Sequence, residues 1–456
     1  MDKQWKQYVP FVCAGAGAAM LAATAAVCMG LDQGGRLDRA GIAVVLALLA
    51  GLSLLLLRLE GVKRDALLVM LLPIGAAMLF RALSLDYISG DYVSFLQHWA
   101  QFFRTYGGFS TIASNVGNYN VPYLYYIAFM SYIDVPDLYM YKLLSILFDM
   151  ALAWGCFRLV RCLTGDRREG LASLVAFAAA LLLPVVVLNG AYWGQCDVIY
   201  GALCVHAAAL VMEGKNKTSV ALMAVAFSFK LQAIFVLPLW GVLWLAKKVK
   251  FGELWVFPLA YLATILPAVF LGKPLLDILG IYFGQMTEVP NLVLNAPTIY
   301  QFIPSAMHEG LAEGHLASGL GIAAAAALVL VLLGLGFWLK DRLNRDIIMT
   351  MAVVLCIGVP FFLPHMHERY FFLADVFTLC WACANIRRLP VAVLAGGASL
   401  AGYIVYLRRK YNFVLRLGGA QFGMALEAVA MLAALVISVW VLVEQLREVK
   451  KREGLA

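Results

Sequence analysis

Long apolar stretches alternate with short polar connections along almost the whole chain. Many of these stretches have about the 20 residues that an α-helix needs to cross the hydrocarbon core of a bilayer. The pattern predicts about fourteen membrane-crossing helices, at residues 8–30, 40–57, 66–83, 139–160, 170–188, 196–212, 218–229, 231–246, 254–271, 318–339, 346–363, 370–386, 389–406 and 422–443. The predicted fold class is therefore all-α, a polytopic bundle of about 12–14 transmembrane helices that forms a single integral membrane domain over residues 1–456.

Two connections are much longer than the others, at residues 84–138 and 272–317. In the first, residues 91–106 carry aromatic and polar side chains at helical spacing, which predicts an amphipathic helix on the membrane surface. The apolar stretch 121–133 is too short to cross and is predicted to be re-entrant or interfacial. We expect both long connections to be external loops at the mouth of an active site.

The composition supports a membrane protein. Of the 456 residues, 63% are hydrophobic and only 14% are charged, which is too little charge for the surface of a soluble protein. The net charge of +8 does not indicate nucleic-acid binding, because the basic residues are spread over many connections, as the positive-inside rule predicts. The clusters assigned to the cytoplasmic side are Lys3/Lys6, Arg58/Lys63/Arg64, Arg161/Arg167/Arg168, Lys215/Lys217, Lys247/Lys248/Lys250, Lys340/Arg342/Arg345, Arg387/Arg388 and the tail from Arg447 to Arg452.

This orientation places both termini inside and gathers the polar motifs on the external face. The motifs are Asp86–Asn120, Asn189–Asp197, Lys230–Gln232, Asn291–Gln301 and His365–Arg369. Arg408, Arg409, Lys410 and Arg416 also fall outside, against the positive-inside rule. Convergence of separate polar motifs on one side of a membrane protein is typical of an external catalytic or binding cavity.

Two external carboxylates are candidates for a general base. Asp91 opens the predicted surface helix, where it could cap free backbone N–H groups or face a cavity as a base. Asp86 is the second candidate. Asp197 stands at the start of a returning helix and is either a helix cap or a ligand-binding carboxylate.

Amide and aromatic side chains near these carboxylates are candidates for binding sugar or acceptor hydroxyls. Such groups also suit turns that enter a membrane, so a purely structural role is the alternative. The candidates are Asn118, Asn120, Tyr123, Trp193, Gln195, Asp197, Gln232, Tyr300 and Gln301.

Lys230 interrupts an apolar stretch, at a cost of ~2.5–3.5 kcal/mol unless the ammonium reaches water or a partner. It either reaches the interface or binds an anion such as a phosphate.

The motif PHMHERYFF supplies His365, His367, Glu368 and Arg369 between two apolar stretches. A metal site is one interpretation of this cluster, and a phosphate clamp in which Glu368 supports Arg369 is the favoured one. No cofactor is expected, and a divalent metal is the disfavoured alternative.

Four segments carry a resemblance to a known family. WGQCD, SFKLQAIFVLP, NAPTIYQF and LPHMHERYFFLAD resemble the bacterial mannosyltransferase-like membrane proteins related to the GPI mannosyltransferase II group, which have the GT-C glycosyltransferase fold. The resemblance extends from about Asp91 to Asp375, and the last segment is the most specific. Residues 1–60 and 390–456 carry no such motif.

The resemblance implies a glycosyltransferase of the bacterial plasma membrane with an extracytoplasmic active site. Its donor would be a polyprenyl-phosphate sugar, such as a hexose or mannose, and its acceptor a hydroxyl of a glycan, lipid or protein. Transfer would invert the anomeric carbon by direct displacement, with Asp91, or otherwise Asp86, as base. The family often shows a closely spaced acidic pair, whereas these two residues lie five positions apart.

Two other classes of protein remain open from the residues themselves. One is a transporter or flippase of lipid-linked sugars, although no internal repeat of interrupted helices is visible. The other is a non-catalytic subunit of an envelope-assembly complex. No Gly-rich nucleotide loop occurs, which argues against a nucleotide-sugar donor.

Overall fold

The computed structural model describes residues 3–165, 170–285, 290–452 and 454, so Arg167 and Arg168 lie outside the described residues. Within these ranges nine helices are long and apolar enough to cross a membrane, and the bent pair Leu171–Leu182 and Pro184–Trp193 would add a tenth. The chain is therefore a multi-pass helical membrane protein, as predicted. The other four predicted crossings correspond to helices that are too short to count as spans, so the prediction of 12–14 crossings is confirmed for nine or ten. They are α9 (Asp197–Met212), α10 (Asn216–Phe229), α11 (Pro238–Leu245) and α18 (Phe372–Ala384).

Internal contacts divide the chain into two compact units. Unit 1 comprises Met1–His206 and Ile265–Pro274, and unit 2 comprises Ala207–Thr264 and Leu275–Ala456. The predicted carboxylates Asp86, Asp91 and Asp197 thus belong to unit 1, and all the predicted phosphate-binding residues belong to unit 2.

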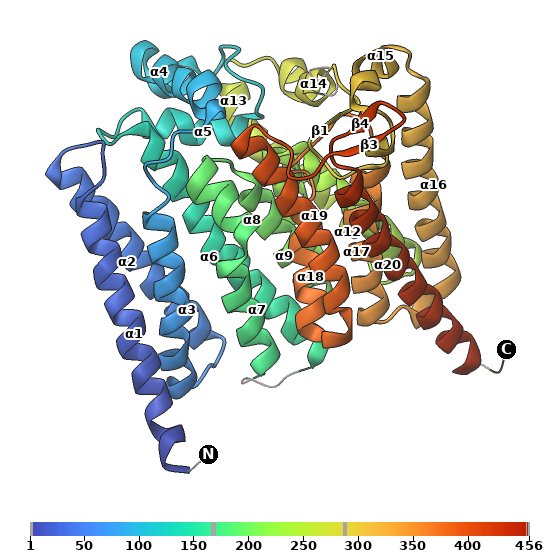
Figure 1. Ribbon diagram of the computed structural model, residues 1–456, viewed down its shortest axis with the longest axis horizontal. Helices are drawn as coiled ribbons and strands as arrows, with labels where there is room; N and C mark the ends of the chain where they lie inside the picture. The colour runs from blue at the N-terminus through green and yellow to red at the C-terminus, as the bar shows by residue number, and fades with distance from the viewer. Residues whose placement is uncertain (1–2, 166–169, 286–289, 453, 455–456) are drawn as a thin grey trace. The chain divides into compact units, whose positions relative to one another are not determined.

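Unit 1 consists of long helices followed by a cap of short ones. Figure 1 shows α1, α2 and α3 side by side in blue, with α4 and α5 at one end of the helices of this unit. The elements are α1 (Lys3–Met29), α2 (Arg36–Leu59), α3 (Arg64–Ala82), η1 (Tyr92–Leu96), α4 (Gln97–Tyr106), η2 (Gly108–Thr111), α5 (Val121–Met130), α6 (Asp137–Thr164), α7 (Leu171–Leu182), α8 (Pro184–Val187), η3 (Leu188–Trp193) and the first part of α9, while the end of α13 (Val256–Phe270) also falls in this unit.

The predicted elements of the first long connection are present in unit 1. The surface helix is formed by η1, a π-helical turn, and α4. The segment predicted to be re-entrant is α5, a helix of 10 residues that is too short to cross a bilayer. The bend after α7 measures 42° and has a local cause, since Leu183 precedes Pro184 and is therefore extended (φ −60°, ψ 121°).

Helix α1 packs closely on α3 because glycine faces glycine. A Cβ atom on Gly75 would lie 2.5 Å from the carbonyl oxygen of Gly17. Small residues at such positions let membrane helices approach at backbone distance, and the contacts between the two backbones replace the hydrophobic driving force that lipid removes.

The two ends of unit 1 differ in chemistry, as the sequence predicted. At one end Glu60 forms an ion pair with Arg161 and accepts a hydrogen bond from Trp154 Nε1 at 2.8 Å. At the other end the backbone N–H of Asp32, between α1 and α2, donates to Asp86 at 3.1 Å. The basic connection therefore lies opposite the carboxylate segment.

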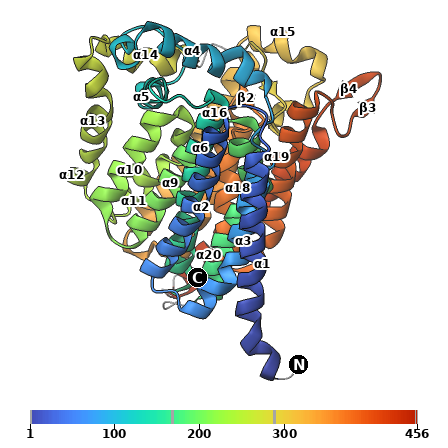
Figure 2. The same cartoon turned by 90° about the vertical axis from the view of Figure 1, so that its left-hand side faces the viewer.

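Unit 2 has long helices with two small β-structures at one end. Figures 1 and 2 show α15, β1 and β2 and the β3–β4 hairpin near one end of α16 to α20. Besides α10, α11 and α18, the elements are η4 (Leu231–Phe235), α12 (Phe251–Leu254), α14 (Leu275–Gln285), β1 (Val293–Leu294), η5 (Ile299–Phe302), η6 (Ser305–Met307), α15 (His308–Glu313), α16 (Leu316–Leu339), η7 (Lys340–Arg342), α17 (Arg345–Phe362), β2 (Met366–His367), η8 (Ile386–Arg388), α19 (Leu389–Arg408), β3 (Leu415–Leu417), β4 (Ala420–Phe422) and α20 (Ala425–Arg452).

The basic connections that contain Lys248 and Arg345 lie at the end of unit 2 opposite the β-structures. Lys248 Nζ donates to the Asp341 carbonyl at 3.1 Å, and Arg345 donates to the Met212 carbonyl at 3.0 Å. Strand β1 pairs with β2 in parallel, which joins the second long connection to the PHMHERYFF motif. These basic connections therefore lie opposite the polar motifs, whereas Arg408, Arg409, Lys410 and Arg416 lie at the end with the β-structures, on the side where the predicted orientation also placed them.

Candidate functional site

A short segment between α3 and η1 carries both candidate bases of unit 1. Lys142 of α6 fixes this segment, because its buried ammonium donates to the backbone carbonyls of Ser84, Leu85 and Tyr87 at 2.9, 2.7 and 2.7 Å. Lys142 was not among the site residues predicted from the sequence. A lysine inside the apolar stretch 139–160 was the available signal, since such residues are expensive in a membrane and are retained for a role.

The Asp91 carboxylate is oriented by side chains of a distant loop. Its Oδ2 accepts hydrogen bonds from Trp193 Nε1 at 3.1 Å and from Gln195 Nε2 at 2.6 Å. It makes no capping hydrogen bond to the helix that it opens. Ser89 performs that task, since its hydroxyl accepts from the Tyr92 N–H at 3.1 Å. The helix-cap interpretation of Asp91 was therefore wrong.

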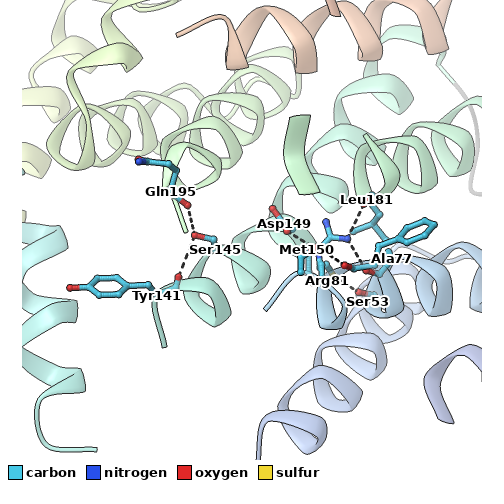
Figure 3. A network of polar contacts seen from close by, with 11 residues as sticks. Ser53, Ala77, Arg81, Tyr141, Ser145, Asp149, Met150, Leu181 and Gln195 are labelled. Carbon is cyan, nitrogen blue, oxygen red and sulfur yellow. Dashed lines mark hydrogen bonds and ion pairs between the residues drawn. The ribbon is translucent and has the colours of Figure 1, made fainter. Parts of the chain in front are cut away.

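The loop that supplies Trp193 and Gln195 is itself held by hydrogen bonds. The Ser89 hydroxyl donates to the Trp193 carbonyl at 2.8 Å, and the Ser145 hydroxyl donates to the Gln195 carbonyl at 2.6 Å. Figure 3 shows Ser145 between Tyr141 and Gln195. Gly194 adopts φ +84°, a conformation that favours glycine, so the chain can reverse between the two donors.

Asp197 and Asn189 close the same loop from both ends. Asn189 Nδ2 donates to Asp197 Oδ2 at 2.8 Å, and the Asp197 N–H donates back to Asn189 Oδ1 at 3.2 Å. Both residues are fully buried. This reciprocal pair shows that Asp197 stabilises the loop. Of the residues predicted in this loop, Trp193 and Gln195 are the ones that contact the candidate base Asp91.

Aromatic residues of the first long connection contact the loop that holds Asp91. The Tyr119 hydroxyl donates to Gln195 Oε1 at 3.3 Å, which helps to set the direction of the amide, and Asn118 directly precedes Tyr119. The Tyr119 ring lies 4.8 Å from that of Tyr123, which is buried. Asn120 is also buried and caps α5, as the structural alternative for this segment proposed.

Asp86 is engaged differently from Asp91. Its Oδ1 accepts from the Tyr139 hydroxyl at 2.6 Å and from the Asp32 backbone at 3.1 Å. These bonds tie three parts of unit 1 together. Asp91 Oδ2 instead accepts from two side chains of the loop after α8, which orient the carboxylate.

A buried ion pair lies deeper in unit 1 and was also missed from the sequence. Arg81 Nε donates to Asp149 Oδ2 at 2.8 Å, with both side chains fully buried. Arg81 Nη1 also donates to the carbonyls of Ala77 and Leu181 at 3.0 Å (Figure 3). The pair connects α3, α6 and α7, and a charged residue in each of two apolar stretches was the signal that could have revealed it.

Lys230 stands at a break between two helices of unit 2, as predicted. Helix α10 ends at Phe229, Lys230 is extended (φ −154°, ψ 134°), and η4 begins at Leu231. Lys230 is only 6% exposed, so its ammonium does not simply reach into solvent. Gln232 beside it is buried, and its Oε1 has no hydrogen-bond partner among the described residues.

The PHMHERYFF motif lies against the second long connection. His365 has φ +61°, its N–H donates to the Leu292 carbonyl at 2.6 Å, and its Nδ1 donates to the Asn291 carbonyl at 2.9 Å. Next to it, Leu294 pairs with His367 in the β1–β2 register. These contacts bring together two of the polar motifs that the sequence placed on one face.

Glu368 lies between the basic residues of the motif. It is 1% exposed, and its Oε1 is 3.7 Å from Arg369 Nη1 and 3.9 Å from His367 Nδ1. Burial, together with the positive charges of Arg369 and Lys230, lowers the pKa of His367 to about 3. His367 is therefore neutral at pH 7, and Lys230 and Arg369 are the cations of this cluster.

A small polar cavity adjoins the second long connection. It has a volume of about 210 Å³, and Asn291, Asn295, Gln301, His308 and Tyr411 are among the residues that line it. The predicted residue Gln301 donates to the Ala296 carbonyl at 2.9 Å. Tyr300 points elsewhere and donates to the Phe362 carbonyl at 2.9 Å.

Comparison with known proteins adds no family assignment. The sequence matches no protein-family model and no curated protein. Among the residues that the structure describes, no three His, Cys, Asp or Glu side chains gather where they could hold a metal ion. The candidate groups are thus an oriented carboxylate in unit 1, Asp91, and in unit 2 the cations Lys230 and Arg369 with the buried carboxylate Glu368.

Proposed function

We propose that this membrane protein is a glycosyltransferase that transfers a sugar, such as a hexose, from a polyprenyl-phosphate donor to an acceptor hydroxyl on the extracytoplasmic face of a bacterial plasma membrane. The observation that carries the proposal is the Asp91 carboxylate, which two side-chain donors orient at 3.1 and 2.6 Å and which does not cap its helix. A carboxylate whose direction is fixed in this way can accept the proton of an acceptor hydroxyl.

The reaction would be a direct displacement with inversion. The acceptor oxygen attacks the anomeric carbon, the bond from that carbon to the phosphate oxygen breaks, and the phosphate leaves with the electron pair. The acceptor proton passes to Asp91. Trp193 and Gln195 act as positioning residues, because their N–H groups fix the carboxylate while the acceptor approaches.

The leaving phosphate gains negative charge as the bond breaks, so fixed cations lower the barrier. Lys230 and Arg369 would supply those cations, and Glu368 would hold Arg369 in place. Neutral His367 would bind the phosphate as a hydrogen-bond donor rather than as a cation. The resemblance of WGQCD and LPHMHERYFFLAD to the GT-C family supports the same assignment.

Transfer and donor binding are tested separately with the purified full-length protein. Asp91→Asn keeps an acceptor for both hydrogen bonds but loses the base, so we expect the transfer rate to fall by about 10²–10⁴-fold while polyprenyl-phosphate binding persists. Lys230→Ala should weaken binding of polyprenyl phosphate. Asp86→Asn is the matched control, a carboxylate of the same segment whose loss should leave transfer within about threefold of wild type.

Each outcome discriminates between functions. Full transfer by Asp91→Asn would refute the role of base. Polyprenyl-phosphate binding by the wild type without transfer from any donor sugar would favour a transporter of lipid-linked sugars, and vesicles containing a labelled lipid-linked sugar would then show movement across the bilayer. Absence of both binding and transfer would favour a non-catalytic subunit.

A further inference from the structure

The end of α19 and its connection to α20 carry four basic residues and no acidic one. Arg408, Arg409, Lys410 and Arg416 are exposed, and no acidic residue occurs in residues 376–426. We call residues 408–422 the basic hairpin. Its charge opposes the positive-inside rule in the orientation predicted from the sequence, and the proposed reaction does not use it.

The basic hairpin has one apolar and one polar face. Leu415 pairs with Phe422 and Leu417 with Ala420, whereas Arg416 pairs with Gln421. Because side chains alternate along a strand, the first four share one face and the last two share the other. The apolar side is not packed into a core, since Leu417 is 60% exposed.

The hairpin is a built structure rather than a loose loop. Gly418 and Gly419 have φ +56° and +83°, which a tight two-residue turn between antiparallel strands requires. The Gly423 N–H donates to Ser305 Oγ at 3.2 Å, and Asn412 Nδ2 donates to the Ala401 carbonyl at 3.1 Å. These bonds fasten both ends of the hairpin to unit 2.

The flanking helices determine the depth of the hairpin in the membrane. It follows the candidate span Ile386–Arg408 directly and precedes the candidate span Ala425–Arg452. A segment that short between two crossings is expected to lie in the headgroup region. Figure 2 shows the β3–β4 hairpin projecting outward beside α19. Phe413, which precedes β3 in the same connection, is 64% exposed.

We propose that the basic hairpin binds the phosphate headgroups of anionic phospholipids at the membrane surface. Exposed apolar side chains beside four cations fit a lipid surface, because acyl chains cover the former while phosphates neutralise the latter. A soluble polyanion would leave Phe413 and Leu417 in water. This inference does not depend on the proposed transferase activity.

Photocrosslinking tests the contact at the hairpin itself. Phe413 is replaced by p-benzoylphenylalanine in the full chain, which is then placed in nanodiscs of equal parts phosphatidylglycerol and phosphatidylcholine. Mass spectrometry counts the lipid adducts after irradiation. We expect phosphatidylglycerol adducts to exceed phosphatidylcholine adducts by roughly threefold or more, and the excess to vanish in the variant Arg408→Gln/Arg409→Gln/Lys410→Gln/Arg416→Gln.

Two control variants separate local charge from folding and from net charge. Arg447→Gln/Lys450→Gln/Lys451→Gln/Arg452→Gln removes the same charge from the other end of α20 and should keep the excess. Replacing the three arginines of the hairpin with lysine should also keep it. Equal adducts in the wild type, no lipid adducts, or an excess that survives the glutamine variant would each overturn the proposal. Charge-dependent binding of soluble polyphosphate without lipid adducts would identify a soluble polyanion as the partner instead.

Discussion

Replacing Arg81 with methionine should lower the free energy of unfolding by about 3–5 kcal/mol, because it leaves the Asp149 carboxylate buried without its cation. The two groups are 2.8 Å apart and fully buried. At an effective dielectric constant of about 20, Coulomb's law gives an attraction of about 6 kcal/mol at that distance.

The intact pair is expected to contribute much less than this attraction. Removing two ions from water costs several kcal/mol for each ion, which offsets most of the Coulomb term. The hydrogen bonding is also incomplete, since Arg81 Nη2 and Asp149 Oδ1 have no partner among the described residues. Replacing both residues with apolar ones should therefore change the free energy of unfolding little, whereas replacing only one should lower it strongly.

A double-mutant cycle measures this difference. Arg81→Met and Asp149→Leu should each be destabilised by about 3–5 kcal/mol, whereas the double variant should lie within about 2 kcal/mol of wild type. Reversible unfolding in lipid–detergent bicelles supplies the free energies. Ser53→Ala, which removes a neighbouring hydrogen bond to Met150 without touching a charge, is the control and should cost about 1 kcal/mol. A double variant as unstable as the sum of the two single variants would refute the reasoning.

Two further changes test the site. Lys142→Met removes three hydrogen bonds to backbone carbonyls, so both the melting temperature and the transfer rate should fall, the rate by more than about tenfold, and a variant with unchanged transfer would contradict the anchoring role. The pKa of His367 is lowered from 6.5 to about 3, so the unfolded chain takes up a proton first as the pH falls, and the contribution to stability is present above pH 6.5 and is lost toward pH 3. His367→Asn should flatten the melting temperature against pH in that window, and an unchanged slope would show that other groups dominate.

The long-range pattern of the sequence predicted the long helices, because burial in lipid imposes one requirement on every crossing, but four of the fourteen predicted crossings are too short in the structure to be spans. The break at Lys230 was predictable for the same reason, since one lysine in an apolar stretch demands a local departure from the helix. The pairing of Val293 with Met366 was not predictable, because strands of two residues have no period to read.

The candidate site was predicted only in part. The sequence named Asp91, Trp193 and Gln195 separately, but it did not show that the last two hold the first, because a hydrogen bond across about one hundred residues leaves no local pattern. It also left a helix cap as one interpretation of both Asp91 and Asp197. Their difference lies in which partner each carboxylate meets, and that depends on the tertiary fold.

The span between Asp91 and its donors has a consequence for biogenesis. The carboxylate is synthesised 102 residues before Trp193 and 104 before Gln195. While the chain is still being inserted, Asp91 is therefore present before the residues that orient its carboxylate. Lys142, which binds the segment before Asp91, is synthesised after Asp91 and before Trp193. A chain whose synthesis stops before the loop after α8 would contain Asp91 without the two side chains that donate to its carboxylate. If Asp91 is the proposed base, activity would therefore appear only after this loop has been made.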